Sequence, residues 1–208
     1  RYWRDWSSDV CSSDLINFDK IPSDCRVIFV SAINGRYPKY IENRIKSLRE
    51  AGKIVIEDSA QALGSRTEND VHCGTMGDMG VFSFGAPKII TTGQGGCIVT
   101  NNKEYSDEIV AIKNFGRTVK VGEVYNVMGL NFKFTDLQAS FGIPQMKKLP
   151  FIMLHKKQLF RWYKKHLKNK VDFIQTDLDH VTPTYPEILV SKRDKLVEEL
   201  RAEKIGCR

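Results

Sequence analysis

Two short apolar runs on either side of an amphipathic stretch restrict the fold of this chain more than any other feature. Residues 26–31 and 53–57 are rich in β-branched side chains and have the length of buried strands. Between them, Ile41, Ile45 and Leu48 recur at the spacing of one helix face. Strand, helix and strand in this order predict a βαβ unit, and therefore a parallel sheet with helices packed on it.

The pattern continues toward the carboxyl end of the chain. Strands are expected at residues 80–84 and 97–100, followed by helices at 103–115, from 135 onward and at 151–170, weak strands at 171–175 and 188–190, and a last helix from 191 onward. Thr135 and Gln138 have capping-box spacing, and Pro144 is expected to kink the helix that they start. Ser191 is expected to cap the last helix. This order of elements predicts an α/β fold with a mostly parallel sheet.

The chain divides into three expected segments. Residues 1–15 show neither helical nor alternating periodicity, so we interpret them as a non-native tail, with a native disordered tail as the alternative. Residues 16–148 are expected to form part of a large domain, and residues 149–208 a linking helix and the incomplete start of a smaller α+β domain. Since the sequence stops just past a helical pattern, we expect a fragment at both ends.

Composition excludes several classes of protein. The five cysteines are widely spaced and form no C-x-x-C pair, which argues against a disulfide framework and a zinc site and favours reduced thiols in the cytoplasm. The four histidines show no ligand spacing, so no metal site is expected. No apolar run approaches the roughly 20 residues of a membrane span. The net charge of +7 favours anionic partners without identifying them.

Two ionisable residues follow predicted strands at the same end of the predicted sheet. Asp58 comes directly after the strand at 53–57, and Lys88 lies four residues after the strand at 80–84. Ligands of parallel α/β sheets bind beyond the carboxyl ends of the strands, so both residues are candidates for a binding site. The alternative for Asp58 is an N-cap of a helix over residues 59–63, and the alternative for Lys88 is a solvated surface charge.

Neighbouring residues favour the functional interpretation of Lys88. Ser83 precedes it by five residues, and the turn Gly93-Gln94-Gly95-Gly96 follows it, where backbone can approach a ligand closely. Gln61 lies three residues beyond Asp58, about one helical turn away, so the two side chains can face one ligand.

Three separated runs carry a resemblance to a known family. Residues 57–65 (EDSAQALGS), 74–96 (GTMGDMGVFSFGAPKIITTGQGG) and 129–142 (GLNFKFTDLQASFG) are similar in order, spacing and residue type to the DegT/DnrJ/EryC1/StrS sugar aminotransferases. The resemblance covers about residues 16–207. It implies part of the pyridoxal phosphate-binding large domain of a fold type I transferase. The turn at residues 93–96 departs from the family's usual GEGG, because Gln94 replaces the glutamate.

The resemblance also implies roles for five residues. Lys88 matches the lysine that forms a Schiff base with pyridoxal phosphate, and Asp58 matches the acid that pairs with the pyridine nitrogen. Gln61 matches a glutamine that lies against the ring, and Ser83 a serine that binds the cofactor phosphate. Asn131 matches an asparagine that reaches the phosphate in the neighbouring subunit, which implies a homodimer with shared active sites.

The implied activity is transfer of an amino group from an amino acid, L-glutamate being expected, to a keto-sugar nucleotide in the synthesis of amino sugars for surface polysaccharides. The family also contains dehydratases in which histidine replaces the lysine, so Lys88 favours the aminotransferase. Family chains are longer and carry an upstream Ser-Gly-Thr loop for the cofactor phosphate, so we expect this piece to be inactive by itself.

Two further interpretations remain open from the sequence. The chain would be non-catalytic if it belonged to a truncated pseudoenzyme or a regulator that keeps the cofactor fold. The basic helix at 151–170 would serve nucleic-acid binding, although a solvated face is the expected use and no nucleic-acid partner is expected. Finally, Asn34-Gly35-Arg36 is expected to form a turn, with contact to substrate or cofactor as the alternative.

Overall fold

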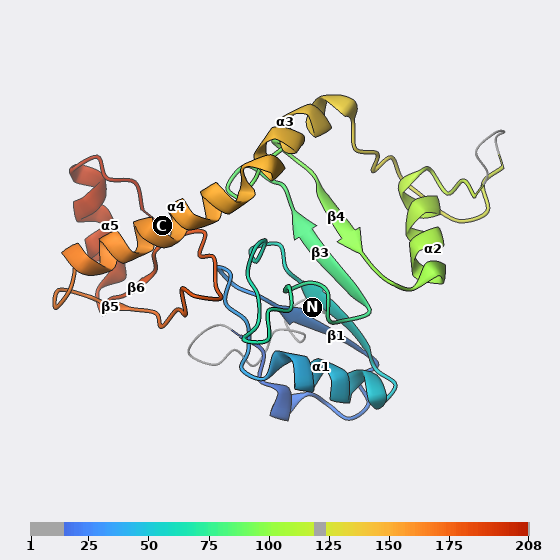
Figure 1. Ribbon diagram of the computed structural model, residues 1–208, viewed down its shortest axis with the longest axis horizontal. Helices are drawn as coiled ribbons and strands as arrows, with labels where there is room; N and C mark the ends of the chain where they lie inside the picture. Colours follow the sequence, from blue (N-terminus) through green and yellow to red (C-terminus); the bar gives the residue numbers. More distant parts are fainter. Residues whose placement is uncertain (1–14, 119–123, 208) are drawn as a thin grey trace.

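The computed structural model describes residues 15–118 and 124–207, so the interpretation of residues 1–14 as a tail lies outside the described residues. A four-stranded sheet, with α1 on one face, forms the part of the molecule that holds the candidate site (Figure 1). A two-stranded sheet and α5 lie at the far end of a long helix, α4 (Figure 1). Within residues 15–118 and 124–207, no helix is long and apolar enough to cross a membrane.

The main sheet has its strands in sequence order. They are β1 (Val27–Ser31), β2 (Ile54–Asp58), β3 (Met79–Ser83) and β4 (Gly96–Val99). The first three strands are parallel, and β4 pairs with β3 in the antiparallel direction. The predicted parallel sheet is therefore confirmed, and it ends in a β3–β4 hairpin. The loop of this hairpin carries Lys88.

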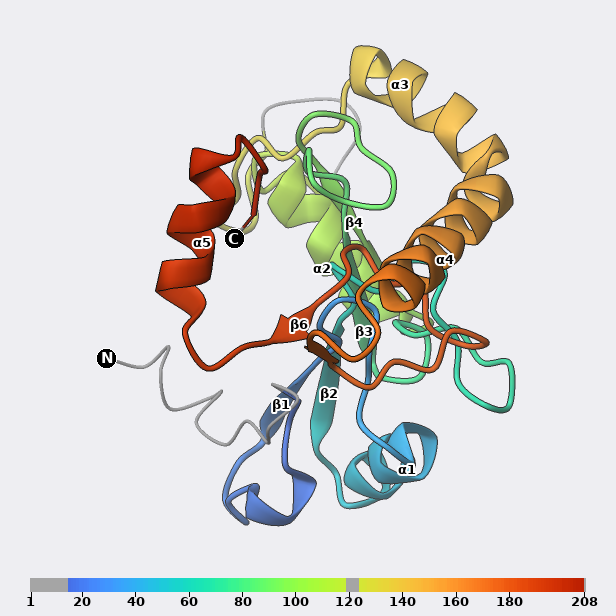
Figure 2. The ribbon, with the colours of Figure 1, turned by 90° about the vertical axis from the view of Figure 1, so that its left-hand side faces the viewer.

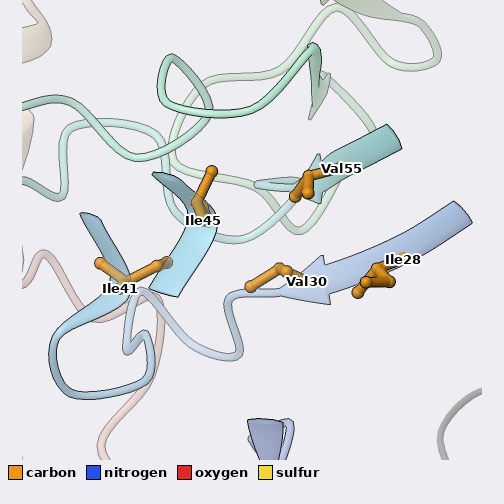
Figure 3. Packing of buried hydrophobic residues seen from close by; sticks show 5 residues of the cluster. All are labelled: Ile28, Val30, Ile41, Ile45 and Val55. Carbon is orange, nitrogen blue, oxygen red and sulfur yellow. The ribbon is translucent and has the colours of Figure 1, made fainter. Parts of the chain in front are cut away.

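Helix α1 (Ile41–Glu50) connects β1 to β2 and packs on one face of the sheet. Its buried residues Ile41 and Ile45 meet the inward side chains of the two strands, Ile28, Val30 and Val55 (Figure 3). Side chains alternate between the two faces along β1. Phe29, between Ile28 and Val30, therefore points to the opposite face, and it is 48% exposed. The spacing that predicted an amphipathic helix thus corresponds to a real core.

Four further α-helices, one short 3-10 helix and two short strands complete the described chain. They are η1 (Phe18–Lys20, a 3-10 turn), α2 (Lys103–Lys113), α3 (Asp136–Lys147), α4 (Leu149–His166), α5 (Arg193–Ala202), β5 (Asp172–Phe173) and β6 (Ile188–Leu189). β5 and β6 pair in the antiparallel direction. Helices α3 and α4 run end to end and bend where they meet (Figure 2).

The two predicted helix caps have different outcomes. Thr135 forms the expected capping box, since its hydroxyl accepts from the Gln138 N–H and the Gln138 side chain accepts from the Thr135 N–H. The prediction that Ser191 caps the last helix is wrong, because Lys192 occupies the cap position and makes no side-chain hydrogen bond there. The helix continues through Pro144 as far as Lys147.

A buried carboxylate shapes the connection from β2 to β3. Glu57 is 1% exposed, and its two oxygens accept hydrogen bonds from the backbone N–H groups of Gly74, Met76 and Gly77 at 2.7, 2.6 and 2.6 Å. Burial raises the pKa of Glu57 above its ordinary value, and the three N–H donors oppose that rise. The carboxylate holds the chain where it turns back to begin β3 at Met79.

The first testable prediction concerns this carboxylate. Replacing Glu57 by glutamine should lower the free energy of unfolding by about 1–3 kcal/mol, because an amide NH₂ would then face a backbone N–H donor without access to water. Urea unfolding followed by circular dichroism measures the change. Glu50→Gln on the exposed side of α1 is the matched control and should leave the free energy within about 0.5 kcal/mol of the starting protein. Equal values for the two variants would contradict the prediction.

Candidate active site

Two polar side chains end neighbouring parallel strands on the same face of the sheet. β2 ends at Asp58 and β3 ends at Ser83. Asp58 pairs with Val81, and paired residues direct their side chains to the same face. Ser83 lies two residues beyond Val81 and shares that face, whereas Val55 belongs to the opposite, α1-covered face. Asp58 and Ser83 therefore lie on the face away from α1, at the carboxyl edge of the sheet.

The surroundings of Asp58 leave part of its carboxylate available. Its Oδ1 accepts a hydrogen bond from the Ala60 N–H at 3.1 Å. The helix that the capping alternative required at residues 59–63 is absent, because these residues form turns instead. Among the described residues, nothing donates to Oδ2 of Asp58, whose side chain is half-buried. This oxygen is therefore able to accept a hydrogen bond from a ligand.

Lys88 lies in the loop of the β3–β4 hairpin, and the backbone of that loop is well held. The Phe84 N–H donates to Gly95 O at 2.8 Å, and the Thr92 N–H donates to Phe84 O at 2.9 Å, so the loop closes at its base. Ile90, two residues after Lys88, is buried at 2% exposure. The Lys88 side chain is half-buried, and its Nζ has no hydrogen-bond or ion-pair partner in the part of the chain that the structure describes.

Helix α3 holds the same loop from outside the hairpin. The Gln145 side chain forms two hydrogen bonds with one residue, accepting from the Thr91 N–H at 3.0 Å and donating to Thr91 O at 2.6 Å. Gln138 donates to Gln94 O at 3.0 Å. The glycine-rich turn serves the loop as well: Gly95 has φ +129°, and a side chain there would collide with Phe134. Gly95 thus has a structural use that the sequence did not indicate.

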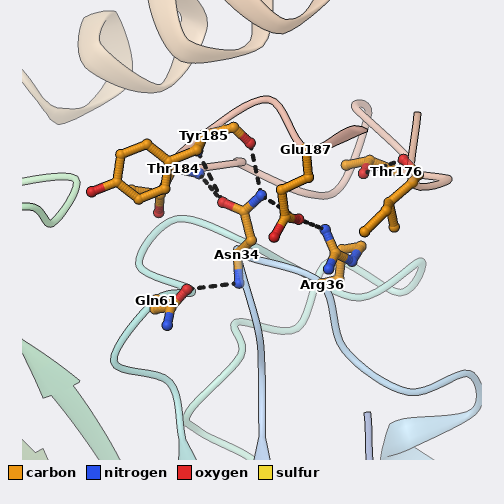
Figure 4. Close-up of polar contacts among 8 residues, drawn as sticks. Asn34, Arg36, Gln61, Thr176, Thr184, Tyr185 and Glu187 are labelled. Carbon is orange, nitrogen blue, oxygen red and sulfur yellow. Dashed lines mark hydrogen bonds and ion pairs between the residues drawn. The ribbon is translucent and has the colours of Figure 1, made fainter. Parts of the chain in front are cut away.

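Gln61 is held by a residue that the sequence analysis did not assign to the site. Its Oε1 accepts from the Asn34 N–H at 3.0 Å (Figure 4). The predicted turn at Asn34 and Gly35 is confirmed, with φ of 49° and 81°, and the carboxyl end of β1 leads into it. The Asn-Gly pair predicted the turn, but it gave no sign that the Asn34 side chain is 2% exposed and fully hydrogen-bonded.

Asn131 does not join the other four predicted residues. It is exposed and pairs with Asn114, the residue that follows α2. In Figure 1 this segment lies beside α2, on the far side of β4 from β1 and β2. Around it, exposed apolar side chains recur along the chain, and this set is called here the 124–146 surface: Val124, Tyr125, Val127, Met128, Leu130, Phe132, Phe134, Leu137, Phe141, Ile143 and Met146.

The donor set at the sheet edge fits a small polar ligand better than a metal ion. The ends of β2 and β3 and the segments that follow them supply one carboxylate, one hydroxyl, one amide and one primary amine, from Asp58, Ser83, Gln61 and Lys88. The Ser83 Oγ accepts from the Gly85 N–H at 3.3 Å, which leaves the hydroxyl hydrogen for a ligand acceptor. Among residues 15–118 and 124–207, no three or more His, Cys, Asp or Glu side chains are grouped to hold a metal ion.

Comparison with known proteins gives consistent results. The sequence model of the DegT/DnrJ/EryC1/StrS aminotransferase family matches residues 21–208. The chain is similar to a GDP-perosamine synthase from Escherichia coli O157:H7, with 29% identity over 182 residues, 88% of this chain and 50% of the relative. It therefore spans about half the length of the curated relatives that it matches.

Solved structures share the fold. An aminotransferase of the same family from Brucella abortus superposes with a TM-score of 0.82 at 24% identity, covering 93% of this chain and 55% of that one. A Helicobacter pylori aminotransferase involved in the biosynthesis of pseudoaminic acid gives 0.80 at 23% identity, covering 94% and 54%. At these identities the likeness shows the fold, and it confirms the predicted α/β architecture.

The second prediction tests how α3 holds the lysine-bearing loop. Gln145→Ala removes both hydrogen bonds to Thr91, so the Thr91 and Thr92 amides should exchange with deuterium about tenfold faster. Hydrogen exchange with mass spectrometry measures this on the peptide that covers residues 84–95. Gln158→Ala, on the exposed side of α4, is the matched control and should change nothing in that peptide. Unchanged exchange in Gln145→Ala would show that the loop is held by other contacts.

Proposed function

Because the chain belongs to the DegT/DnrJ/EryC1/StrS aminotransferase family, we propose that it forms part of a pyridoxal phosphate-dependent aminotransferase. Its fold is part of that of the fold type I enzymes. One observation carries the proposal: β2 and β3 present a carboxylate and a hydroxyl on one face, and the loop after β3 brings a lysine whose amine is unengaged among the described residues.

Four of the residues at the sheet edge would hold the cofactor. Lys88 would bind it covalently through Nζ, and Asp58 Oδ2 would accept a hydrogen bond from the protonated pyridine nitrogen. Gln61 would lie against the ring, and the Ser83 hydroxyl would donate to the phosphate. Bound pyridoxal phosphate would supply an aromatic ring that accepts electrons when a substrate loses its Cα proton.

Each side chain has a task that its chemistry allows. Lys88 would move the proton at the substrate's Cα once its amine is released, because a neutral amine can take a proton and the resulting ammonium can return it. Asp58, being acceptor-only when ionised, would keep the ring nitrogen protonated. A lysine at this position, where the family's dehydratases have histidine, favours the aminotransferase reaction over dehydration.

The proposed substrates are an amino acid, L-glutamate, as donor and a keto-sugar nucleotide as acceptor. The name of the Escherichia coli relative, a GDP-perosamine synthase, supports a nucleotide-linked sugar. The net charge of +7 suits a substrate that carries a diphosphate, because a basic surface raises the local concentration of anions. The product would serve the synthesis of amino sugars for surface polysaccharides.

The third prediction is a test of the cofactor and its attachment. The intact protein that contains this chain should take up pyridoxal phosphate with a visible absorbance band, and borohydride should then fix the cofactor on the peptide containing Lys88. Lys88→Ala should abolish the fixation and the absorbance band of the lysine-linked cofactor, whereas Lys103→Ala on exposed α2 should change neither. Mass spectrometry locates the modified lysine. Absence of cofactor uptake, or fixation on another lysine, would refute the proposal.

Addition of L-glutamate to the loaded protein separates the enzyme from the pseudoenzyme alternative. An aminotransferase should transfer the glutamate amino group to the cofactor and lose the visible band, with 2-oxoglutarate released in equal amount. A protein that binds the cofactor but leaves the band unchanged with every amino acid tried would be the non-catalytic form.

We further propose that the intact protein is a homodimer in which Asn131 acts on the cofactor phosphate of the neighbouring subunit. The supporting observation is the 124–146 surface, which includes Asn131's neighbours Leu130 and Phe132 at 58% and 64% exposure. Large exposed apolar side chains that gather in one segment are typical of interaction sites, because their exposure to water is unfavourable. A second subunit would cover the surface and bring Asn131 to an active site.

The fourth prediction follows from that surface. Met128 is 94% exposed, so Met128→Asp should leave the isolated subunit folded while placing a charge in the dimer interface. We expect the dissociation constant of the dimer, measured by analytical ultracentrifugation, to rise at least about tenfold. Ile205→Asp, at an exposed apolar residue beyond α5, is the control and should stay dimeric. A monomeric starting protein, or a Met128→Asp variant that dimerises as tightly, would contradict the proposal.

A further inference from the structure

A tyrosine from the C-terminal part of the chain contacts the loop that carries the lysine. The Tyr185 hydroxyl donates a hydrogen bond to Pro87 O at 2.9 Å. That carbonyl belongs to the peptide unit that joins Pro87 to Lys88, so the hydroxyl fixes the backbone directly before the lysine. Tyr185 is 98 positions away from Pro87 in sequence, and the contact is therefore a product of the tertiary fold.

The backbone of Tyr185 is in turn held by one buried side chain. Asn34 Oδ1 accepts from the N–H groups of Thr184 and Tyr185 at 2.8 and 2.9 Å, and Asn34 Nδ2 donates to Tyr185 O at 2.7 Å (Figure 4). Nδ2 also donates to Glu187 Oε2 at 2.7 Å. At 2% exposure the amide has no water to replace these partners, so it fixes the direction in which residues 184–187 run.

The same asparagine reaches the other side of the candidate site through its own backbone. Its N–H donates to Gln61 Oε1, in the turn that follows β2 and Asp58. Asn34 therefore connects Gln61 to Tyr185, and through Tyr185 to the peptide unit of Lys88. Three segments that are far apart in sequence, the turns after β1 and β2 and the C-terminal segment, meet at this one residue (Figure 4).

Helix α4 sets the side chain of Tyr185. Lys156 donates from Nζ to Thr184 O at 3.1 Å, and the same ammonium lies over the Tyr185 ring, 5.8 Å from its centre. Tyr185 is 41% exposed as a residue, so packing alone leaves its ring room to turn. The cation and the hydroxyl contact together keep the ring pointed at the loop.

We propose that Tyr185 and Asn34 are positioning residues that hold the peptide unit of Lys88 in register with Gln61. Neither side chain is assigned contact with the reacting atoms. Tyr185 acts on the backbone of the lysine, and Asn34 acts through Tyr185 and through Gln61. The role for catalysis rests on the proposed function, but the physical coupling between these residues does not require the cofactor.

The decisive experiment uses the intact protein without cofactor. Tyr185→Phe keeps the ring and removes only the hydroxyl, so the peptide over residues 84–92 should exchange with deuterium about fivefold faster, as expected for the loss of one neutral hydrogen bond. The peptide over β1 and β2 should be unchanged. Tyr163→Phe on α4 is the matched control and should leave both peptides unchanged. Unchanged exchange over residues 84–92 in Tyr185→Phe overturns the inference.

A second variant tests Asn34 without removing the side chain. Asn34→Asp retains the acceptor oxygen and the positive φ of 49° that aspartate tolerates, but it loses both Nδ2 hydrogen bonds and sets a second carboxylate beside Glu187. Exchange over residues 84–92 should rise at least as much as in Tyr185→Phe. If Asn34→Asp unfolds, Tyr185→Phe still decides. A folded Asn34→Asp protein with unchanged exchange overturns the role of Asn34.

A third readout concerns the loaded protein. At saturating pyridoxal phosphate, Tyr185→Phe should decrease the visible circular dichroism of the bound cofactor, which depends on its orientation, and should raise the half-saturating concentration about fivefold. Tyr163→Phe should match the starting protein in both. Unchanged dichroism and affinity in Tyr185→Phe would overturn the positioning role. If the starting protein takes up no cofactor at all, the proposed function fails, and the exchange experiment still judges the coupling.

Discussion

The parallel pairing of β2 with β3 is the constraint on which the rest of the site depends, and a buried carboxylate orders the connection between the two strands. Parallel strands need a long connection, commonly a helix, yet the chain between Asp58 and Met79 runs as turns. Glu57 orders the last part of this connection, because three backbone N–H groups within residues 74–77 donate to its two oxygens. Burying an unpaired carboxylate would cost several kcal/mol, so the three donors and the carboxylate stabilise one another. The residue next to Glu57 is Asp58, and its direction across the sheet is fixed by the same pairing.

Several parts of this structure could be predicted from local sequence. Alternating and helical periodicity predicted the βαβ unit, the Thr135 and Gln138 spacing predicted a capping box, and Asn34-Gly35 predicted a turn. Each depends on residues within one or two turns of chain, where propensity and hydrogen-bonding capacity decide the outcome. The family resemblance, in turn, is carried by three runs of sequence and is confirmed by the match over residues 21–208.

Other features depend on distant partners, and no local pattern indicates them. Asp58 looked suitable as a helix cap, but the chain that follows forms turns that are bound to Glu57 through residues 74–77. Ser191 is a good cap by residue type, yet the last helix begins one residue later than it would need. The burial of Asn34 depends on a segment about 150 residues away, and the contact of Tyr185 with Pro87 depends on the course of α4. The family's motifs point to side chains that would touch a ligand. They do not point to residues such as Asn34 and Tyr185, which hold the backbone of the site.

The backbone contacts around Lys88 suit the role that the proposed reaction gives to this residue. A lysine that first carries a cofactor and then moves a proton must change the position of its amine, while its Cα must stay in place. The structure restrains the backbone on both sides, with Tyr185 bound to Pro87 O and Gln145 bound to Thr91. Neither contact involves the lysine side chain, whose rotatable bonds remain available. Asp58 and Ser83, which need not move, are placed at the ends of strands instead, so rigid and mobile groups of the site are held by different kinds of structure.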